Sequence, residues 1–152
     1  MTDQQKYEIN EFFVHVYNQI LAWEGQTLKK ANVSDLSVRE LHIIDSVDHL
    51  SKHGRNTMAN VAKFLSVTPG ALTTAVNALV KKGYLERKYT KEDRRIIFVA
   101  LTGQGEIVNK IHSEYHKQMV ESLDDVLDEE KLAVLMEALA KLGEFFKTKA
   151  EE

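Results

Sequence analysis

Three polar side chains that can hydrogen-bond to nucleic-acid bases recur at every fourth position in the middle of the chain. Thr73, Asn77 and Lys81 share one stripe if this segment is a helix. A threonine can bond to a base edge and pack its methyl group on thymine, an asparagine can pair with adenine, and a lysine reaches a guanine edge or a phosphate. This stripe predicts a helix that lies in the major groove of double-stranded DNA.

The residues before this stripe would bring the start of the helix close to the DNA backbone. Thr68 is a good helix N-cap, and Pro69 suits the first helical position, where its missing N–H costs nothing. Small residues in the first turn let its free N–H groups approach a phosphate. The contacts predicted for this helix are Thr68, Gly70, Ala71, Thr73, Thr74, Asn77 and Lys81.

Positive charge gathers in and after this helix, although the whole chain is acidic with a net charge of −3. Between Pro69 and Val99, seven lysines and arginines stand against three acids, so this segment carries +4 and the remainder −7. Counterion release depends on the face that meets phosphate, so the local charge decides. The charge pattern therefore predicts one basic face.

Much of this basic charge falls on a predicted β-hairpin with strands at 84–88 and 96–101. Arginines on a hairpin suit a narrow minor groove or the neighbouring phosphates, whereas an isolated basic hairpin is usually a solvated turn. Its position directly after the helix favours DNA contact. The basic residues predicted to make it are Arg87, Lys88, Lys91, Arg94 and Arg95.

The apolar periodicity predicts a mainly helical chain in the order α-α-α-α-β-β-α-α, with one small β-hairpin. A short helix, a break of about four residues and a second helix form a helix-turn-helix, and the hairpin adds a wing. Ser37 and Glu40 form a capping-box pattern that begins the second helix. The helices are predicted over residues 6–31, 37–54, 57–65, 69–82, 102–127 and from 128 toward the C-terminus.

Two histidines have a spacing that suits a metal ion. His112 and His116 lie four residues apart, so they face the same side of the fifth predicted helix. Glu24 falls on the apolar stripe of the first helix, and His42 borders that of the second. These four residues make a set of three nitrogens and one oxygen suited to zinc. A hydrogen-bonded polar network without metal is the alternative.

The stretch from Val67 to Gly105 resembles the MarR family of bacterial regulators, above all in Asp93-Arg94-Arg95 and in the run Leu101 to Gly105. The resemblance implies one domain over residues 1–152, working as a homodimer on a palindromic DNA site. Its winged helix-turn-helix would span 36–102, with the recognition helix at 69–82 and the wing at 84–101. Residues 1–35 and 103–152 would form the helical dimerisation region. Asp93 would orient an arginine, with Arg94 or Arg95 entering the minor groove.

Residues 36–45, 68–87 and 91–96 resemble the subgroup of that family that represses fatty-acid biosynthesis genes. This implies a repressor whose partner is an acyl chain or acyl-acyl carrier protein. An acyl chain needs an elongated apolar pocket, expected between the first, second and fifth helices, although such stripes are more often core or dimer interface. The expected lining is Phe12, Phe13, Val16, Ile20, Ile44, Val108, Ile111 and Tyr115.

The histidine and glutamate set resembles a site in zinc-sensing members of the family, so a zinc-responsive regulator is the alternative function. Those sensors also use ligands on the loop after the first helix, often a cysteine, and this chain has no cysteine. No cofactor other than zinc is suggested.

Other classes of protein find no support in the sequence. No G-x-S-x-G, P-loop or G-x-G-x-x-G motif is present, so we expect no enzymatic activity. No apolar run of membrane-spanning length and no secretory signal occur, so we expect a cytoplasmic protein that does not bind membranes.

Overall fold

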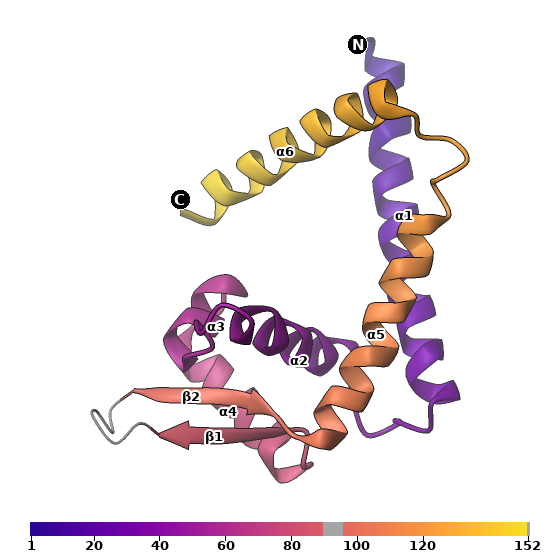
Figure 1. The fold of residues 1–152 in the computed structure, drawn as a ribbon. Coiled ribbons are helices and arrows are strands. Elements are labelled where there is room, and N and C mark those ends of the chain that lie inside the picture. The colour runs from indigo at the N-terminus through magenta and orange to yellow at the C-terminus, as the bar shows by residue number, and fades with distance from the viewer. Residues whose placement is uncertain (90–95, 152) are drawn as a thin grey trace. The chain divides into compact units, whose positions relative to one another are not determined.

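The computed structural model describes residues 1–89 and 96–151, with the side chains of 150 and 151 left aside. Figure 1 shows a mainly helical chain with a two-stranded antiparallel wing, which confirms the predicted fold class and element order. The elements are α1 (Asp3–Lys30), α2 (Val38–Ser51), α3 (Met58–Phe64), α4 (Pro69–Lys81), β1 (Leu85–Tyr89), β2 (Ile97–Leu101), α5 (Gly103–Glu121) and α6 (Glu129–Glu151). Residues 1–112 and 113–152 form two compact units, which we describe separately.

The helix starts follow the capping signals in the sequence. Ser37 Oγ accepts a hydrogen bond from the backbone N–H of Glu40, whose carboxylate accepts one from the N–H of Ser37. Thr57 and Thr68 cap α3 and α4 in the same way, each accepting from the N–H three residues on. The caps fix where each helix begins and therefore which residues face outward.

The fifth helix ends earlier than predicted, at Glu121 rather than near Leu127. Ser122 Oγ donates to the carbonyl oxygen of Met119 at 2.7 Å, and residues 122–126 form turns. Serine and aspartate hydrogen-bond to the nearby backbone and so compete with helix, which explains why Ser122, Asp124 and Asp125 interrupt an otherwise helical pattern.

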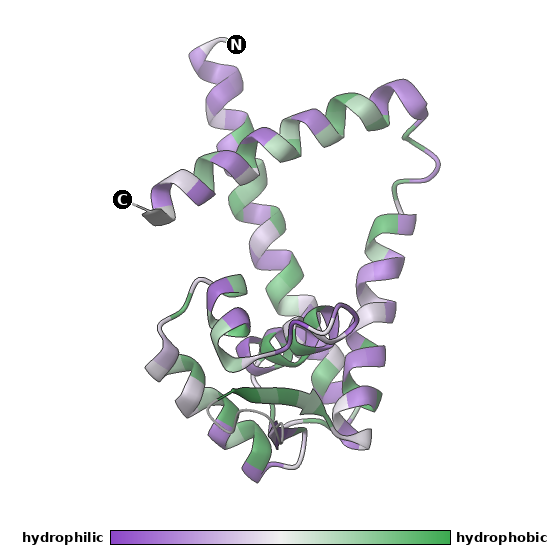
Figure 2. Ribbon diagram, turned by 60° about the vertical axis from the view of Figure 1, so that its left-hand side comes forward, coloured by the Kyte–Doolittle hydropathy of each residue, from purple (hydrophilic) through white to green (hydrophobic). Residues whose placement is uncertain are grey.

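One hydrophobic core holds the first unit together. Figure 2 shows β2 hydrophobic along its length. Leu72, Val76 and Leu79 of α4 are buried in this core, as the periodicity predicted. The core also contains Leu41, Ile44 and Val47 of α2, Val61 and Ala62 of α3, and Leu85 and Val99 of the hairpin.

Polar contacts fix α4 and the hairpin to their neighbours. Lys82, just after α4, donates to both carboxylate oxygens of Glu40 at 2.7 and 2.9 Å, and also bonds to the carbonyl oxygen of Asp35. The backbone carbonyl of Asn56 accepts from the N–H of Val99 at 2.9 Å, which ties β2 to the start of α3. The recognition-type helix is therefore held at its C-terminal end, and the wing at the middle of β2.

Gly105 in the first turn of α5 is a position where a side chain has no room. A Cβ atom there would overlap the carbonyl oxygen of Tyr84, whereas Gly143 in α6 has open space around it. We therefore expect Gly105→Ala to lower the free energy of unfolding by about 1–3 kcal/mol, the usual cost of overpacking.

Gly143→Ala serves as the matched control. It should leave stability unchanged or raise it by roughly 0.5–1 kcal/mol, since alanine is the better helix former. Urea denaturation followed by circular dichroism measures both variants, and equal stabilities for them would contradict this packing.

Candidate functional site

The outer face of α4 carries the side chains predicted to meet DNA. All seven predicted residues are exposed while the apolar face of the helix is buried. They are Thr68, Gly70, Ala71, Thr73, Thr74, Asn77 and Lys81. The helix therefore presents a continuous polar and small-residue surface to solvent, of the kind that fits a major groove.

Hydrogen bonds within the protein use some of the donor and acceptor atoms on this face. Thr73 Oγ1 donates to the carbonyl oxygen of Pro69 at 2.8 Å, and Thr74 Oγ1 donates to that of Gly70 at 3.1 Å. Arg87 Nη2, from β1, donates to Asn77 Oδ1 at 2.7 Å. The wing and the helix are therefore directly linked through side chains that both belong to the predicted interface.

The structure describes both strands of the wing, β1 and β2, but not residues 90–95 between them. Arg87 is half-buried opposite Val99 in the sheet, and Lys88 is exposed and pairs with Glu86 at 2.9 Å. Lys91, Asp93, Arg94 and Arg95 lie outside the described residues.

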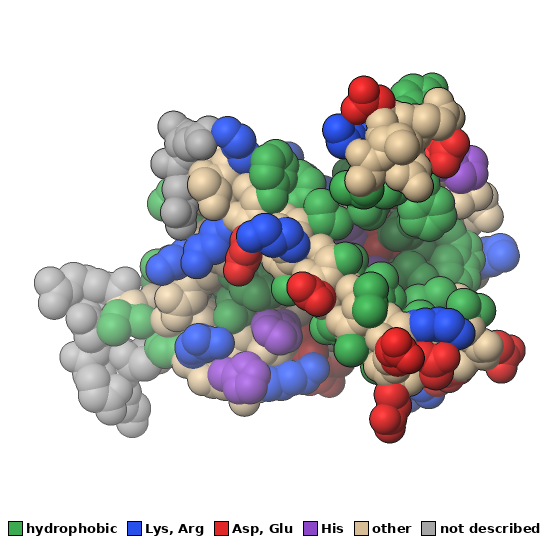
Figure 3. Space-filling model, turned by 90° about the horizontal axis from the view of Figure 1, so that it is seen from above, with side chains coloured by type: hydrophobic (Ala, Val, Ile, Leu, Met, Phe, Trp, Pro, Cys, Tyr) green, Lys and Arg blue, Asp and Glu red, His purple; other side chains and the backbone are tan. Residues whose placement is uncertain are grey.

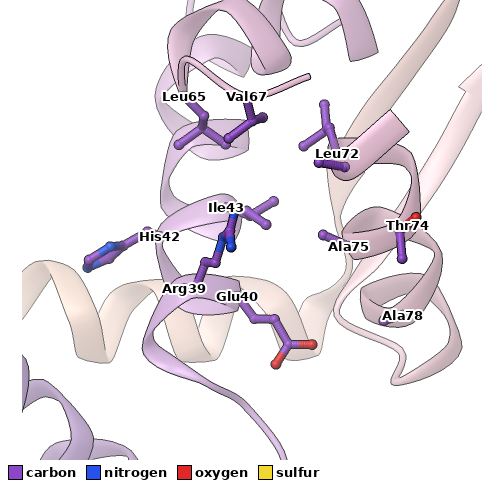
Figure 4. A pocket seen from close by; sticks show the side chains of 11 residues that line it. Arg39, Glu40, His42, Ile43, Leu65, Val67, Leu72, Thr74, Ala75 and Ala78 are labelled. Atoms are coloured by element: carbon purple, nitrogen blue, oxygen red, sulfur yellow. The ribbon is translucent and has the colours of Figure 1, made fainter. Parts of the chain in front are cut away.

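A groove of about 650 Å³ runs between α2 and α4. Figure 4 shows Ile43 of α2 and Ala75 of α4 on its two walls, while the His42 ring points to the other side of α2. Arg39 and Glu40 add charged groups at its edge. The complete lining is Arg39, Glu40, His42, Ile43, Leu65, Val67, Ala71, Leu72, Thr74, Ala75 and Ala78.

Three of the four predicted metal ligands come together in the first unit. His42 Nε2 and His112 Nε2 lie 3.0 and 3.2 Å from the same oxygen, Oε1 of Glu24. One donor atom from each residue fits within 4.8 Å of the others. Glu24 and His112 are 1% and 4% exposed, whereas the His42 side chain is 43% exposed.

The donor set and its spacing fit a zinc ion. Zinc bonds of ~2.0–2.1 Å in tetrahedral geometry separate ligand atoms by roughly 3.3 Å, close to the distances between Glu24 and the two imidazoles. Two imidazoles and one carboxylate are also a common zinc set. The fourth predicted ligand, His116, belongs to the second unit, where its ring contacts that of Tyr115.

Opposite charges set the protonation of this cluster. Burial by itself would raise the pKa of Glu24, but the hydrogen bonds and positive charges of His42 and His112 outweigh it and hold the pKa below its ordinary 4.5. Burial by itself would lower the pKa of His112, but the carboxylates of Asp45 and Glu24 outweigh it and hold the pKa above 6.5. An ionised glutamate beside protonated imidazole is therefore favoured when no metal is bound.

Sequence reasoning missed Asp45 as a member of this cluster. Its Oδ1 lies 3.6 Å from Nδ1 of His112, so two carboxylates flank that imidazole. Asp45 follows His42 by three residues, about one helical turn. That spacing was the signal that could have found it.

The residues predicted to line an acyl pocket occupy different environments. Ile44 and Val108 are buried in the core, and Val16, Ile20 and Ile111 are partly buried. Tyr115, which belongs to the second unit, is buried. Phe12 and Phe13 are 63% and 44% exposed. None of the eight lines the groove between α2 and α4.

Large apolar side chains are exposed along two of the helices, and hydrophobic side chains lie at the surface among charged ones in Figure 3. On α1 they are Tyr7, Ile9, Phe12, Phe13, Val14, Tyr17 and Trp23. On α6 they are Leu132, Val134, Met136, Leu139, Phe145 and Phe146. Among the described residues, no helix combines the length and apolar character that crossing a membrane requires.

Known proteins resemble this chain over nearly its full length. A sequence model described as the MarR family matches residues 36–97. An uncharacterized HTH-type transcriptional regulator of Bacillus subtilis (strain 168), YpoP, is 30% identical over 139 residues, which cover 91% of this chain and 94% of YpoP.

Two solved protein–DNA complexes have the same fold. Streptococcus pneumoniae FabT in complex with DNA superimposes with a TM-score of 0.83 and 35% identity, covering 94% of this chain and 98% of FabT. The Staphylococcus aureus MepR–DNA complex gives a TM-score of 0.72 at 19% identity, covering 91% and 97%.

The buried His112 gives a pH-dependent prediction for the metal-free protein. Its pKa is raised on folding, so its contribution to stability is complete below pH 6.5 and is lost as the pH rises through the folded-state value. With a chelator present, the difference in unfolding free energy between wild type and His112→Gln should therefore shrink as the pH rises from 6 toward 9. Below pH 6.5 we expect a difference of roughly 1–3 kcal/mol, as for other buried hydrogen-bonded groups.

The exposed His15 offers a matched control, because His15→Gln should change stability little at any of these pH values. Urea titrations across the pH range measure all three proteins. A difference for His112→Gln that stays constant or grows with pH would contradict the charged pair.

Proposed function

This chain belongs to the MarR family of DNA-binding transcriptional regulators, and we propose that it is a homodimeric repressor of fatty-acid biosynthesis genes controlled by acyl chains. As a member of that family it is a regulator and not an enzyme. The observation that carries the proposal is the exposed polar face of α4 beside the basic hairpin, in a chain that is 35% identical to FabT over 94% of its length.

In the proposed complex α4 lies in the major groove and the wing lies over the backbone and minor groove. Thr73, Asn77 and Lys81 contact base edges or phosphates, and the first turn of α4 approaches a phosphate. Arg87, Lys88 and Lys91 add positive charge, while Asp93 orients Arg94 or Arg95 for the minor groove. The exposure of every described residue in the α4 set supports this arrangement.

The proposed homodimer would cover the exposed apolar side chains of α1 and α6. Large exposed apolar side chains in such numbers are unfavourable in water and usually mark an interface. Two copies related by a twofold axis present two recognition helices, which suits a palindromic operator.

The proposed effector is a fatty acyl chain, free or carried on acyl carrier protein. Residues 36–45, 68–87 and 91–96 resemble the fatty-acid repressor subgroup, and the whole chain resembles FabT. In addition, α1 and α5 each carry apolar side chains of the kind that could line an acyl site. Because Phe12 and Phe13 are exposed in a single chain, a second copy would supply the remaining cover for an acyl site that includes them.

DNA binding with and without an acylated carrier protein tests this function. We expect long-chain acyl-acyl carrier protein to tighten binding to a palindromic duplex by about 5- to 150-fold, the usual range of allosteric coupling. Affinity should also fall steeply as salt rises, because Lys and Arg contacts release counterions. Fluorescence anisotropy at two salt concentrations measures both effects.

The carrier protein without an acyl chain is the matched control, since it differs only in lacking that chain. An equal response to both forms would contradict acyl sensing. An affinity that does not change with salt would contradict the placement of the basic hairpin on DNA.

We propose zinc-dependent regulation as the second candidate function, on the single observation that Glu24, His42 and His112 converge. Zinc bound there would take the place of the hydrogen bonds between the two imidazoles and Glu24 and would join α1, α2 and α5 through one ion. Such a link would change the conformational freedom of α2 and thereby the position of the DNA-binding elements packed on it.

Zinc binding and its effect on DNA can be measured separately. We expect about one zinc per chain by elemental analysis after dialysis, and at least about tenfold weaker zinc binding in Glu24→Gln and His42→Gln. His49→Gln is the control, because His49 is a histidine of α2 whose ring contacts that of His53, outside the cluster. Substoichiometric zinc that the Glu24 substitution leaves unchanged would contradict this candidate.

A further inference from the structure

The hydrogen bond between β1 and α4 bears on which base the recognition helix reads. Asn77 is exposed on the stripe of α4, and its Oδ1 accepts from Arg87 Nη2 at 2.7 Å. An asparagine side chain pairs with adenine by accepting from the adenine amino group through this oxygen while donating through its NH₂ group. In this protein Arg87 already occupies one of the two lone pairs of that oxygen.

The charge of Arg87 makes sharing the oxygen unfavourable for adenine. The guanidinium carries only donors, and an adenine amino group is also a donor in the major groove. An adenine opposite Asn77 would therefore bring its amino hydrogens toward a cation that competes for the same oxygen. Adenine N7 is also an acceptor, but guanine with N7 and O6, and thymine with O4, accept from the NH₂ group of Asn77 without bringing an amino group of the same base toward the cation.

The two threonines on the same face present acceptors, whereas Asn77 presents a donor. Thr73 and Thr74 each donate their hydroxyl hydrogen to a backbone carbonyl four residues earlier, so their oxygens are left with lone pairs to accept. The proposed recognition face thus combines two accepting threonines with one donating asparagine. Of these three side chains, Asn77 alone is hydrogen-bonded to a residue of another element, because Arg87 belongs to β1.

We propose that Asn77 and Arg87 form a single base-reading unit, in which Arg87 is a specificity-determining residue that makes Asn77 a donor and directs it to guanine or thymine rather than adenine. The inference rests on the proposed placement of α4 in the major groove. Arg87 also restrains the Asn77 side chain, which lowers the conformational entropy lost on binding.

Selection of duplexes from a random library, followed by sequencing, tests this unit. Wild type should enrich a palindromic motif, and Asn77→Ala should identify the base pair that Asn77 reads by abolishing preference there. Arg87→Ala should shift preference at that same base pair toward adenine by at least roughly fivefold, the lower end of what one bidentate pair contributes. In the double variant the shift should vanish, because the reading side chain is gone.

Lys88→Ala is the matched control, since it removes the same charge from the next residue of β1, which pairs with Glu86. It should weaken binding to all sequences alike without changing the motif. If wild type enriches no motif, the placement of α4 on DNA fails. If wild type enriches a motif that Asn77→Ala changes while Arg87→Ala leaves preference at that base pair as in wild type, the placement stands and the reading unit is overturned.

Discussion

The burial of one face of α4 is the constraint on which the proposed recognition surface depends. Leu72, Val76 and Leu79 are packed into the core against α2, α3 and the hairpin, so the helix cannot rotate without exposing them. With 3.6 residues per turn, fixing that face also fixes Thr73 and Asn77 on the opposite side. Lys82 holds the end of the helix through Glu40, so both the rotation of α4 about its axis and its position along α2 are set by contacts away from DNA.

Helix α2 serves two sites with different chemistry. His42 bonds to Glu24 on one side, while Ile43 lies on the wall of the groove that faces α4 on the other. Successive residues of a helix point about 100° apart, so one turn can address both a buried charged cluster and an apolar groove. A change of charge in the cluster therefore acts on the same element that lies across the groove from α4, which gives zinc, as a candidate effector, a short physical route to DNA binding.

Hydrogen bonds inside the protein decide what its exposed polar groups can offer to DNA. A threonine and an asparagine each carry both donors and acceptors. The backbone carbonyls of Pro69 and Gly70 take the hydroxyl hydrogens of the threonines, and Arg87 takes the amide oxygen of Asn77. The list of exposed residues is therefore not enough to predict base preference, because each group is left with only part of its capacity.

The sequence by itself determined the helices, the wing and the exposed stripe, because periodicity, caps and turn residues act over a few neighbouring positions. It also placed Glu24, His42 and His112 in one candidate cluster. The apolar pattern predicted too late an end for α5, because Ser122, Asp124 and Asp125 interrupt the helix there. Only the tertiary structure decided which groups meet across elements: Asp45 beside His112, Lys82 on Glu40, and Arg87 on Asn77. Those contacts join residues up to 67 positions apart, at distances set by the packing of whole helices rather than by any local spacing.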